Sequence, residues 1–131
     1  MLIKNVLIIN DGFIPAFTGL LNLKMPAKQC LEVSSCIEDL VAQHQVISRA
    51  RKAIVEKYCS KDAEGKIVHK GEKILFDTPE LEKQCYEEVR EILEEEIDLT
   101  LSGKIKISAQ EIMTPLQIKL LQDIVEIDET M

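Results

Sequence analysis

The sequence predicts an α+β fold that is mainly α, built as a single domain over residues 1–131. We expect a long antiparallel helical hairpin with a small β-hairpin at its tip, and a short sheet formed by N- and C-terminal strands. Three observations predict this. Apolar residues recur at helical spacing through most of the chain, two β-prone pieces surround Gly71 between the longest helical segments, and 131 residues are the length of one domain.

The first elements are short. Residues 2–9 are rich in Ile, Leu and Val, and the turn residues Asn10-Asp11-Gly12 follow them, which predicts a strand ending in a tight turn. From Phe13 to Leu23 the apolar residues fall at three- and four-residue steps, which predicts a short helix.

The longest predicted helix begins at Pro26 and runs to about Cys59. Four apolar residues recur every seven positions, and a companion series with the polar members His44 and Arg51 lies three or four residues away: Val33, Leu40, Ile47 and Ile54, with Cys30, Ile37, His44, Arg51 and Tyr58. At 1.5 Å per residue, about 34 residues form a rod of roughly 50 Å. We therefore expect this seam to pack on a second helix of the same chain or on another subunit.

The second half of the chain alternates short strands and helices. Residues 60–65 are turn-like and residues 66–76 predict the small β-hairpin. Thr78-Pro79-Glu80 has the form of a helix start, which predicts a second helix from Pro79 to about Glu96. Alternation over 99–107 predicts a strand, capping-box patterns at 108–111 and 114–117 precede a last helix, and the tail from Glu126 is expected to fray.

The two long predicted helices carry opposite charge. The chain has 16 Lys and Arg against 23 Asp and Glu, a net charge of −7. Nine acids and two bases between Glu80 and Asp98 also sum to −7, whereas residues 49–61 have five bases against one acid, a net +4. An antiparallel pair would place residues near 50 beside about 88, so that basic faces acidic. The hypotheses for the acidic helix are an internally salt-bridged pair, a surface for a basic partner, or a mimic of nucleic-acid charge.

No pattern for catalysis or metal binding stands out. The five glycines are dispersed singly, the four cysteines form no CxxC pair, and only His44 and His69 could act as histidine bases. We therefore expect no catalytic residue, no metal and no cofactor. Direct DNA binding is disfavoured by the acidic balance and the scarcity of aromatic residues. The apolar run Val6–Ile9 is too short for a membrane span, and no signal peptide is expected.

Several blocks of the sequence resemble a family of small uncharacterised proteins of tailed bacteriophages and prophages of low-GC Gram-positive bacteria, a domain of unknown function. The blocks are LLNLKMPAKQCLEVSSCIEDL at 20–40, RKAIVEKYCSKDAEGKIV at 51–68, ELEKQCYEEVREILEEEIDL at 80–99 and MTPLQIKLLQDIVE at 113–126. The chain departs from this family at Cys59, where a turn-forming glycine is expected. The resemblance implies a viral origin and a place in the host bacterial cytoplasm, and it assigns no catalytic residue.

The leading hypothesis is a non-enzymatic phage accessory protein that acts by binding a host or phage protein, in an assembly or host-interaction role. Self-association into a homo-oligomer would use the seam residues Val33, Ile37, Leu40, His44, Ile47 and Ile54. One alternative is an immune-evasion (anti-defence) protein that sequesters a small anionic or nucleotide signal at Arg49, Arg51 and Lys52. Another is a small enzyme that uses His44 with Cys or Glu partners.

Overall fold

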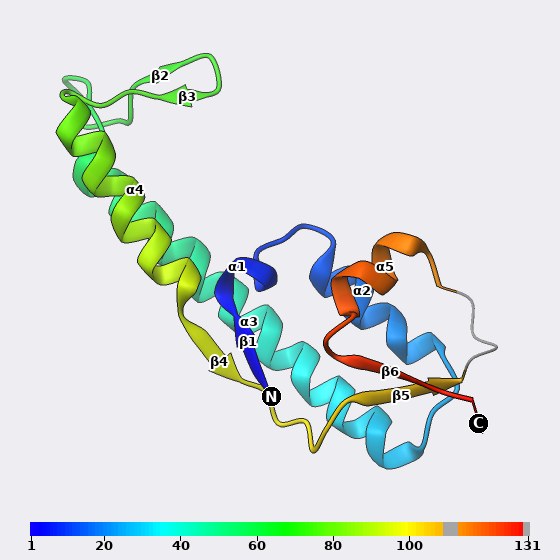
Figure 1. Cartoon of the computed structure of the whole chain (residues 1–131). Helices are drawn as coiled ribbons and strands as arrows, with labels where there is room; N and C mark the ends of the chain where they lie inside the picture. Colours follow the sequence, from blue (N-terminus) through cyan, green and yellow to red (C-terminus); the bar gives the residue numbers. More distant parts are fainter. Residues whose placement is uncertain (109–112, 130–131) are drawn as a thin grey trace. The chain divides into compact units, whose positions relative to one another are not determined.

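The computed structural model describes residues 1–108 and 113–129 and has an α+β, mainly helical fold, which confirms the predicted fold class (Figure 1). In chain order the elements are β1 (Leu2–Lys4), α1 (Asn5–Ile8), α2 (Phe13–Gly19), the 3-10 helix η1 (Leu20–Asn22), α3 (Ala27–Tyr58), β2 (His69–Lys70), β3 (Lys73–Ile74), α4 (Pro79–Glu94), β4 (Glu96–Asp98), β5 (Ile105–Ser108), α5 (Pro115–Leu121) and β6 (Val125–Asp128).

The chain divides into two compact units. The first, which we call the sheet unit, consists of Met1–His44 and Glu96–Met131. The second, the hairpin unit, is the continuous segment Gln45–Glu95. Helix α3 belongs to both, because its first part lies in the sheet unit and its last part in the hairpin unit.

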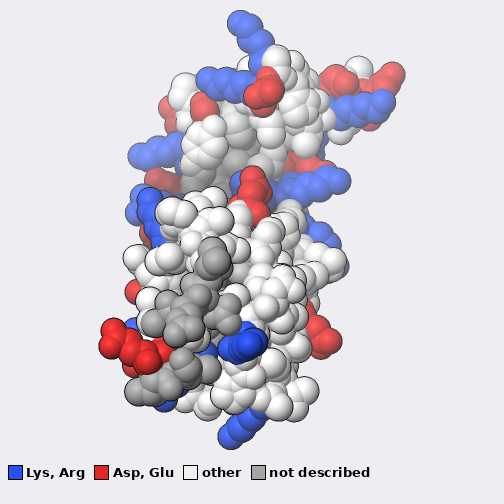
Figure 2. Space-filling view, turned by 90° about the vertical axis from the view of Figure 1, so that its right-hand side faces the viewer, with Lys and Arg blue, Asp and Glu red and all other residues white. Residues whose placement is uncertain are grey.

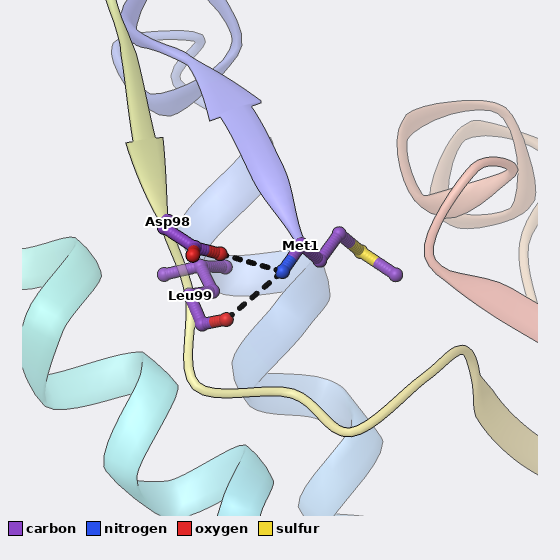
Figure 3. Close-up of polar contacts among 3 residues, drawn as sticks. All are labelled: Met1, Asp98 and Leu99. Carbon is purple, nitrogen blue, oxygen red and sulfur yellow. Dashed lines mark hydrogen bonds and ion pairs between the residues drawn. The ribbon is translucent and has the colours of Figure 1, made fainter.

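In the sheet unit, β1 lies antiparallel to β4, with Ile3 opposite Ile97. The Met1 amino group donates to Asp98 Oδ1 at 2.7 Å and to the Leu99 carbonyl at 3.1 Å (Figure 3). The Leu99 N–H donates in return to the Met1 carbonyl at 2.8 Å. The N-terminal strand thus pairs with a strand that directly follows α4, and not with the strand predicted over 99–107.

The predicted strand over residues 2–9 is wrong beyond Lys4. Residues Asn5–Ile8 form one helical turn instead. The two buried residues of this turn, Asn5 and Ile8, are three positions apart, which suits a helix and not the two-residue period of a strand. The Asn5 Oδ1 accepts a hydrogen bond from Gln43 Nε2 at 3.2 Å, so the polar side chain has a partner in the core.

Apolar residues from both ends of the chain form the core of the sheet unit. The rings of Phe13 and Phe17 lie 6.0 Å apart on α2. The other buried apolar residues come from β1, α1, α2, η1, the first part of α3 and the segments around β5 and α5: Ile3, Ile8, Ala16, Leu20, Val33, Cys36, Leu40, Leu99, Leu101, Ile105, Ile107, Leu121 and Ile124. Contacts among these buried side chains hold the short elements of the sheet unit in place.

A second small sheet joins β5 and β6 in parallel, with Ile105 opposite Val125 and Ile107 opposite Ile127. The expectation of a frayed tail from Glu126 is therefore wrong, because the backbone of this segment pairs with β5. The strand predicted over 99–107 is confined to β5, and β4 ends before it at Asp98. Helix α5 begins with the predicted capping box of Thr114 and Gln117, whereas the pattern at 108–111 lies largely outside the described residues.

In the hairpin unit, the end of α3 packs beside α4, and the short hairpin of β2 and β3 lies at the end of this pair (Figure 1). Gly71, at the β2–β3 turn, has φ of +66°, which an L side chain adopts at a cost. The Thr78 Oγ1 accepts from the Leu81 N–H at 3.2 Å and Pro79 is the first helical residue of α4, as the sequence predicts.

Candidate binding surfaces

The contact between α3 and α4 is centred on Glu88. The Tyr58 hydroxyl donates to Glu88 Oε1 at 2.6 Å, and Lys57 Nζ lies 3.4 Å from the same oxygen. The hydrogen bond from Tyr58 lowers the pKa of the Glu88 carboxyl, and the Lys57 charge lowers it further. The pKa of Lys57 is raised, first by its hydrogen bond with Tyr58 and then by the Glu88 charge. One basic residue of α3, Lys57, therefore does face an acidic residue of α4.

The register of this helix pair differs from the expected one. Residues near 50 were expected beside 88, but Lys57 and Tyr58 lie beside Glu88. The segment between the two helices is closed at its base, where Ser60 hydrogen-bonds through its side chain to Asp77 at 2.6 Å and through its N–H to the Leu75 carbonyl at 2.9 Å.

The predicted seam residues lie at two levels of burial. Val33 and Leu40 are buried in the sheet unit, and Ile47 is buried in the hairpin unit, where 1% of its surface is exposed. Ile37, His44 and Ile54 are half-buried. The three buried side chains offer no surface to a second copy of the folded chain, so any contact between copies has to use the half-buried members and their neighbours.

The hairpin unit has a thin core. Its buried apolar residues are Ile47, Cys59 and Cys85. The remaining apolar residues on the facing sides of the two helices are only half-buried: Ile54, Val55, Leu81, Val89, Ile92 and Leu93. Two packed helices have no third layer to cover such a wide apolar stripe.

The predicted anion-binding residues Arg49, Arg51 and Lys52 are all exposed on α3 in the hairpin unit. The Arg49 Nε donates to the Gln45 carbonyl of the same helix at 3.4 Å. With 3.6 residues per turn, Arg51 lies about 40° from Ile47 around the helix and Arg49 about 160° from it. Arg51 therefore borders the seam, and Arg49 lies on the far side of the helix.

Cysteine thiols are buried in both units. Burial raises the pKa of the Cys36 thiol in the sheet unit. Burial also raises the pKa of the Cys85 thiol, and the nearby Cys59 raises it further. These thiols are protonated at neutral pH and occupy core positions, where cysteine behaves as a small apolar residue.

An exposed apolar surface, which was not among the predicted sites, lies where β6 meets α5. Ile127 of β6 is 60% exposed and Ile118 of α5 is 51% exposed. Both line a hollow of about 220 Å³, together with Ile107, Leu121 and Val125. Figure 2 views the side of the molecule that carries the undescribed residues, and both uncharged residues and a few charged side chains border them. The signal in the sequence was the alternation of Val125 and Ile127, which is too short to distinguish from a frayed end.

Among the residues that the structure describes, no three His, Cys, Asp or Glu side chains are grouped closely enough to hold a metal ion. Within the same ranges no helix has both the length and the apolar content that crossing a membrane requires. Comparisons with protein-family models, with curated proteins and with solved structures found no match.

Proposed function

We propose that this protein acts by binding and that its copies associate through the hairpin unit, where the helix pairs of two copies form a four-helix bundle. The observation that supports this is the half-buried apolar stripe of α3 and α4. A second helix pair would supply the missing layer and remove these side chains from water. The phage accessory role and the host cytoplasm implied by the resemblance form part of this proposal.

Charge supports a second copy as the occupant of this surface. The last part of α3 carries Arg49, Arg51, Lys52 and Lys57 against Glu56, a net +3, whereas α4 has six acids against Lys83 and Arg90, a net −4. In a two-fold arrangement α3 of one copy packs against α4 of the other. Each interface then pairs a basic helix with an acidic one, which a self-complementary contact requires.

Light scattering coupled to size exclusion, at two protein concentrations and two salt concentrations, tests the proposal. We expect a dimer that dissociates more readily at high salt. Arg51→Glu should weaken the dimer about tenfold or more, because it places like charges at the interface. Arg49→Glu is the matched control, since it makes the same charge change on the far side of the helix and should leave the mass unchanged.

A wild-type mass of one chain under all four conditions would show that the proposed association is wrong. Equal effects of Arg49→Glu and Arg51→Glu would show that copies do not meet at the seam side of α3. Circular dichroism of both variants should match the wild type, because both arginines are exposed.

A further inference from the structure

The outer edge of β6 carries backbone groups that point away from β5. The Ile105 N–H donates to the Ile124 carbonyl at 2.8 Å, and this bond determines which residues of β6 hydrogen-bond to β5 in the parallel ladder. The backbone of Glu126 bonds to β5, whereas the N–H and C=O groups of Val125 and Ile127 are directed to the opposite side. In the described part of the chain, no hydrogen bond outside the β5 ladder involves the backbone of Val125 or Ile127.

The other edge of the same sheet is closed. Gln29 of α3 donates from Nε2 to the Lys106 carbonyl at 2.8 Å and accepts from the Lys106 N–H at its Oε1 at 3.0 Å. The amide side chain thereby takes the place of a neighbouring strand on β5, one of the ways in which proteins protect a strand edge. The contrast leaves β6 as the side of this sheet that can accept another strand.

The two faces of β6 differ in character. Residues opposite each other in a parallel pair share a face, so Val125 and Ile127 lie on the face of the buried Ile105 and Ile107. This face is covered over β5 but exposed at Ile127, beside the hollow. The other face carries the exposed Glu126, which has the exposed Lys106 of β5 opposite it, and Asp123 and Glu129 are exposed before and after the strand.

A second copy of β6 is a poor match for this edge. The antiparallel register that uses the outward groups of both Val125 and Ile127 would place Glu126 directly opposite Glu126 of the other copy. Like charges directly opposite each other destabilise a strand pair. A partner strand with a basic residue opposite Glu126 forms a more stable pair, because the side chains of a non-hydrogen-bonded antiparallel pair approach closely.

We propose that the outer edge of β6 docks an extended segment of a different protein, which adds as a strand and has the pattern apolar, basic, apolar. Its basic residue pairs with Glu126, and one of its apolar side chains enters the hollow beside Ile118 and Ile127. Main-chain hydrogen bonds to Val125 and Ile127 supply the contact common to all such segments, and the side chains supply the selectivity. This inference goes beyond self-association and uses the other unit of the chain.

The test is a nuclear magnetic resonance titration of the ¹⁵N-labelled full chain with the peptide Thr-Val-Lys-Val-Thr. The expected result is a shift of the Val125 and Ile127 amide signals, with affinity about fivefold above that of Thr-Val-Glu-Val-Thr. Glu126→Lys should reverse this preference. If neither peptide moves these signals, or if both bind equally well in wild type, the proposal is overturned.

Two variants at one position distinguish docking through backbone hydrogen bonds from nonspecific binding to exposed apolar side chains. Ile127→Pro removes an N–H that points outward, so the β5–β6 ladder is kept while the docking bond is lost. Ile127→Val keeps that N–H and should bind like wild type. The proposal is supported if Ile127→Pro loses peptide binding while Ile127→Val retains it. If Ile127→Pro had a lower solution mass than the wild type, the proposal would be overturned, because the edge would then be joining two copies of this chain.

Discussion

Single polar side chains connect segments of this protein that are far apart in sequence. Gln29 binds both backbone groups of Lys106, and Tyr58 donates to Glu88 across the helix pair. Neither contact could be predicted, because both partners are ordinary surface residues in the sequence and only the fold brings them together. By contrast, the opposite charge of the two helices around Lys57 and Glu88 was evident from the sequence.

The Tyr58 hydrogen bond predicts a pH-dependent stability. A carboxyl whose pKa is lowered by folding stabilises the protein above its unfolded pKa, and this contribution is lost as the pH falls through the folded pKa. Tyr58→Phe should therefore lower the melting temperature at pH 7, and the difference from wild type should shrink toward pH 3. Thermal melts of both proteins at the two pH values measure this. In a Glu88→Gln background the pH dependence of the difference should disappear, and an equal difference at both pH values would contradict the assignment.

Helix starts were the elements that the sequence predicted best, because capping is local. Thr78-Pro79 and Thr114-Pro115 begin α4 and α5, and each uses a hydroxyl within three residues of its partner. Strands were predicted less well. Val125 and Ile127 form a strand only because β5 lies beside them, and residues 5–8 form a helical turn in which Asn5 is paired with Gln43.

The capping box of α5 predicts a measurable loss of stability when the hydroxyl is removed. Thr114 Oγ1 accepts from the Gln117 N–H at 3.2 Å, and the Thr114 N–H donates to Gln117 Oε1 at 2.9 Å. Thr114→Ala should lower the free energy of unfolding by about 1 kcal/mol, whereas Thr114→Ser should retain most of it. Urea unfolding monitored by circular dichroism measures both. If the Ser and Ala variants lose the same amount, the hydroxyl is not what stabilises the start of α5.

For the molecule as a whole, the heptad seam predicted that α3 packs on apolar partners, but not where they come from. Val33 and Leu40 are buried within the sheet unit, whose other core residues include members of β5 and α5 that follow them by more than sixty positions in the chain. A seven-residue repeat is the same whether the partner is a second helix, a small sheet or another copy. This is why the seam predicted the burial of Ile47 but could not identify the partner.

Burial of Ile47 predicts how the chain responds to a charge at that position. Ile47→Asp should lower the free energy of unfolding by about 3 kcal/mol or more, because it places an unpaired carboxylate in an apolar site. Val46→Asp introduces the same carboxylate at a neighbour that is 51% exposed, and should cost less than about 1 kcal/mol. Urea unfolding together with solution mass tests the pair. Unchanged stability and mass in Ile47→Asp would mean that the α3 seam does not pack as described.

The pairing of β1 with β4 also sets an order of events during synthesis. Residues 2–4 leave the ribosome before the hairpin unit, yet their partners at 96–98 emerge only after the whole hairpin unit has been made. The hairpin unit is continuous in sequence, so its helices can meet while the rest of the chain is still being added. Strand β1 must therefore wait until the hairpin unit has emerged, and the sheet unit closes after it, at the cost in loop entropy that so distant a pairing carries.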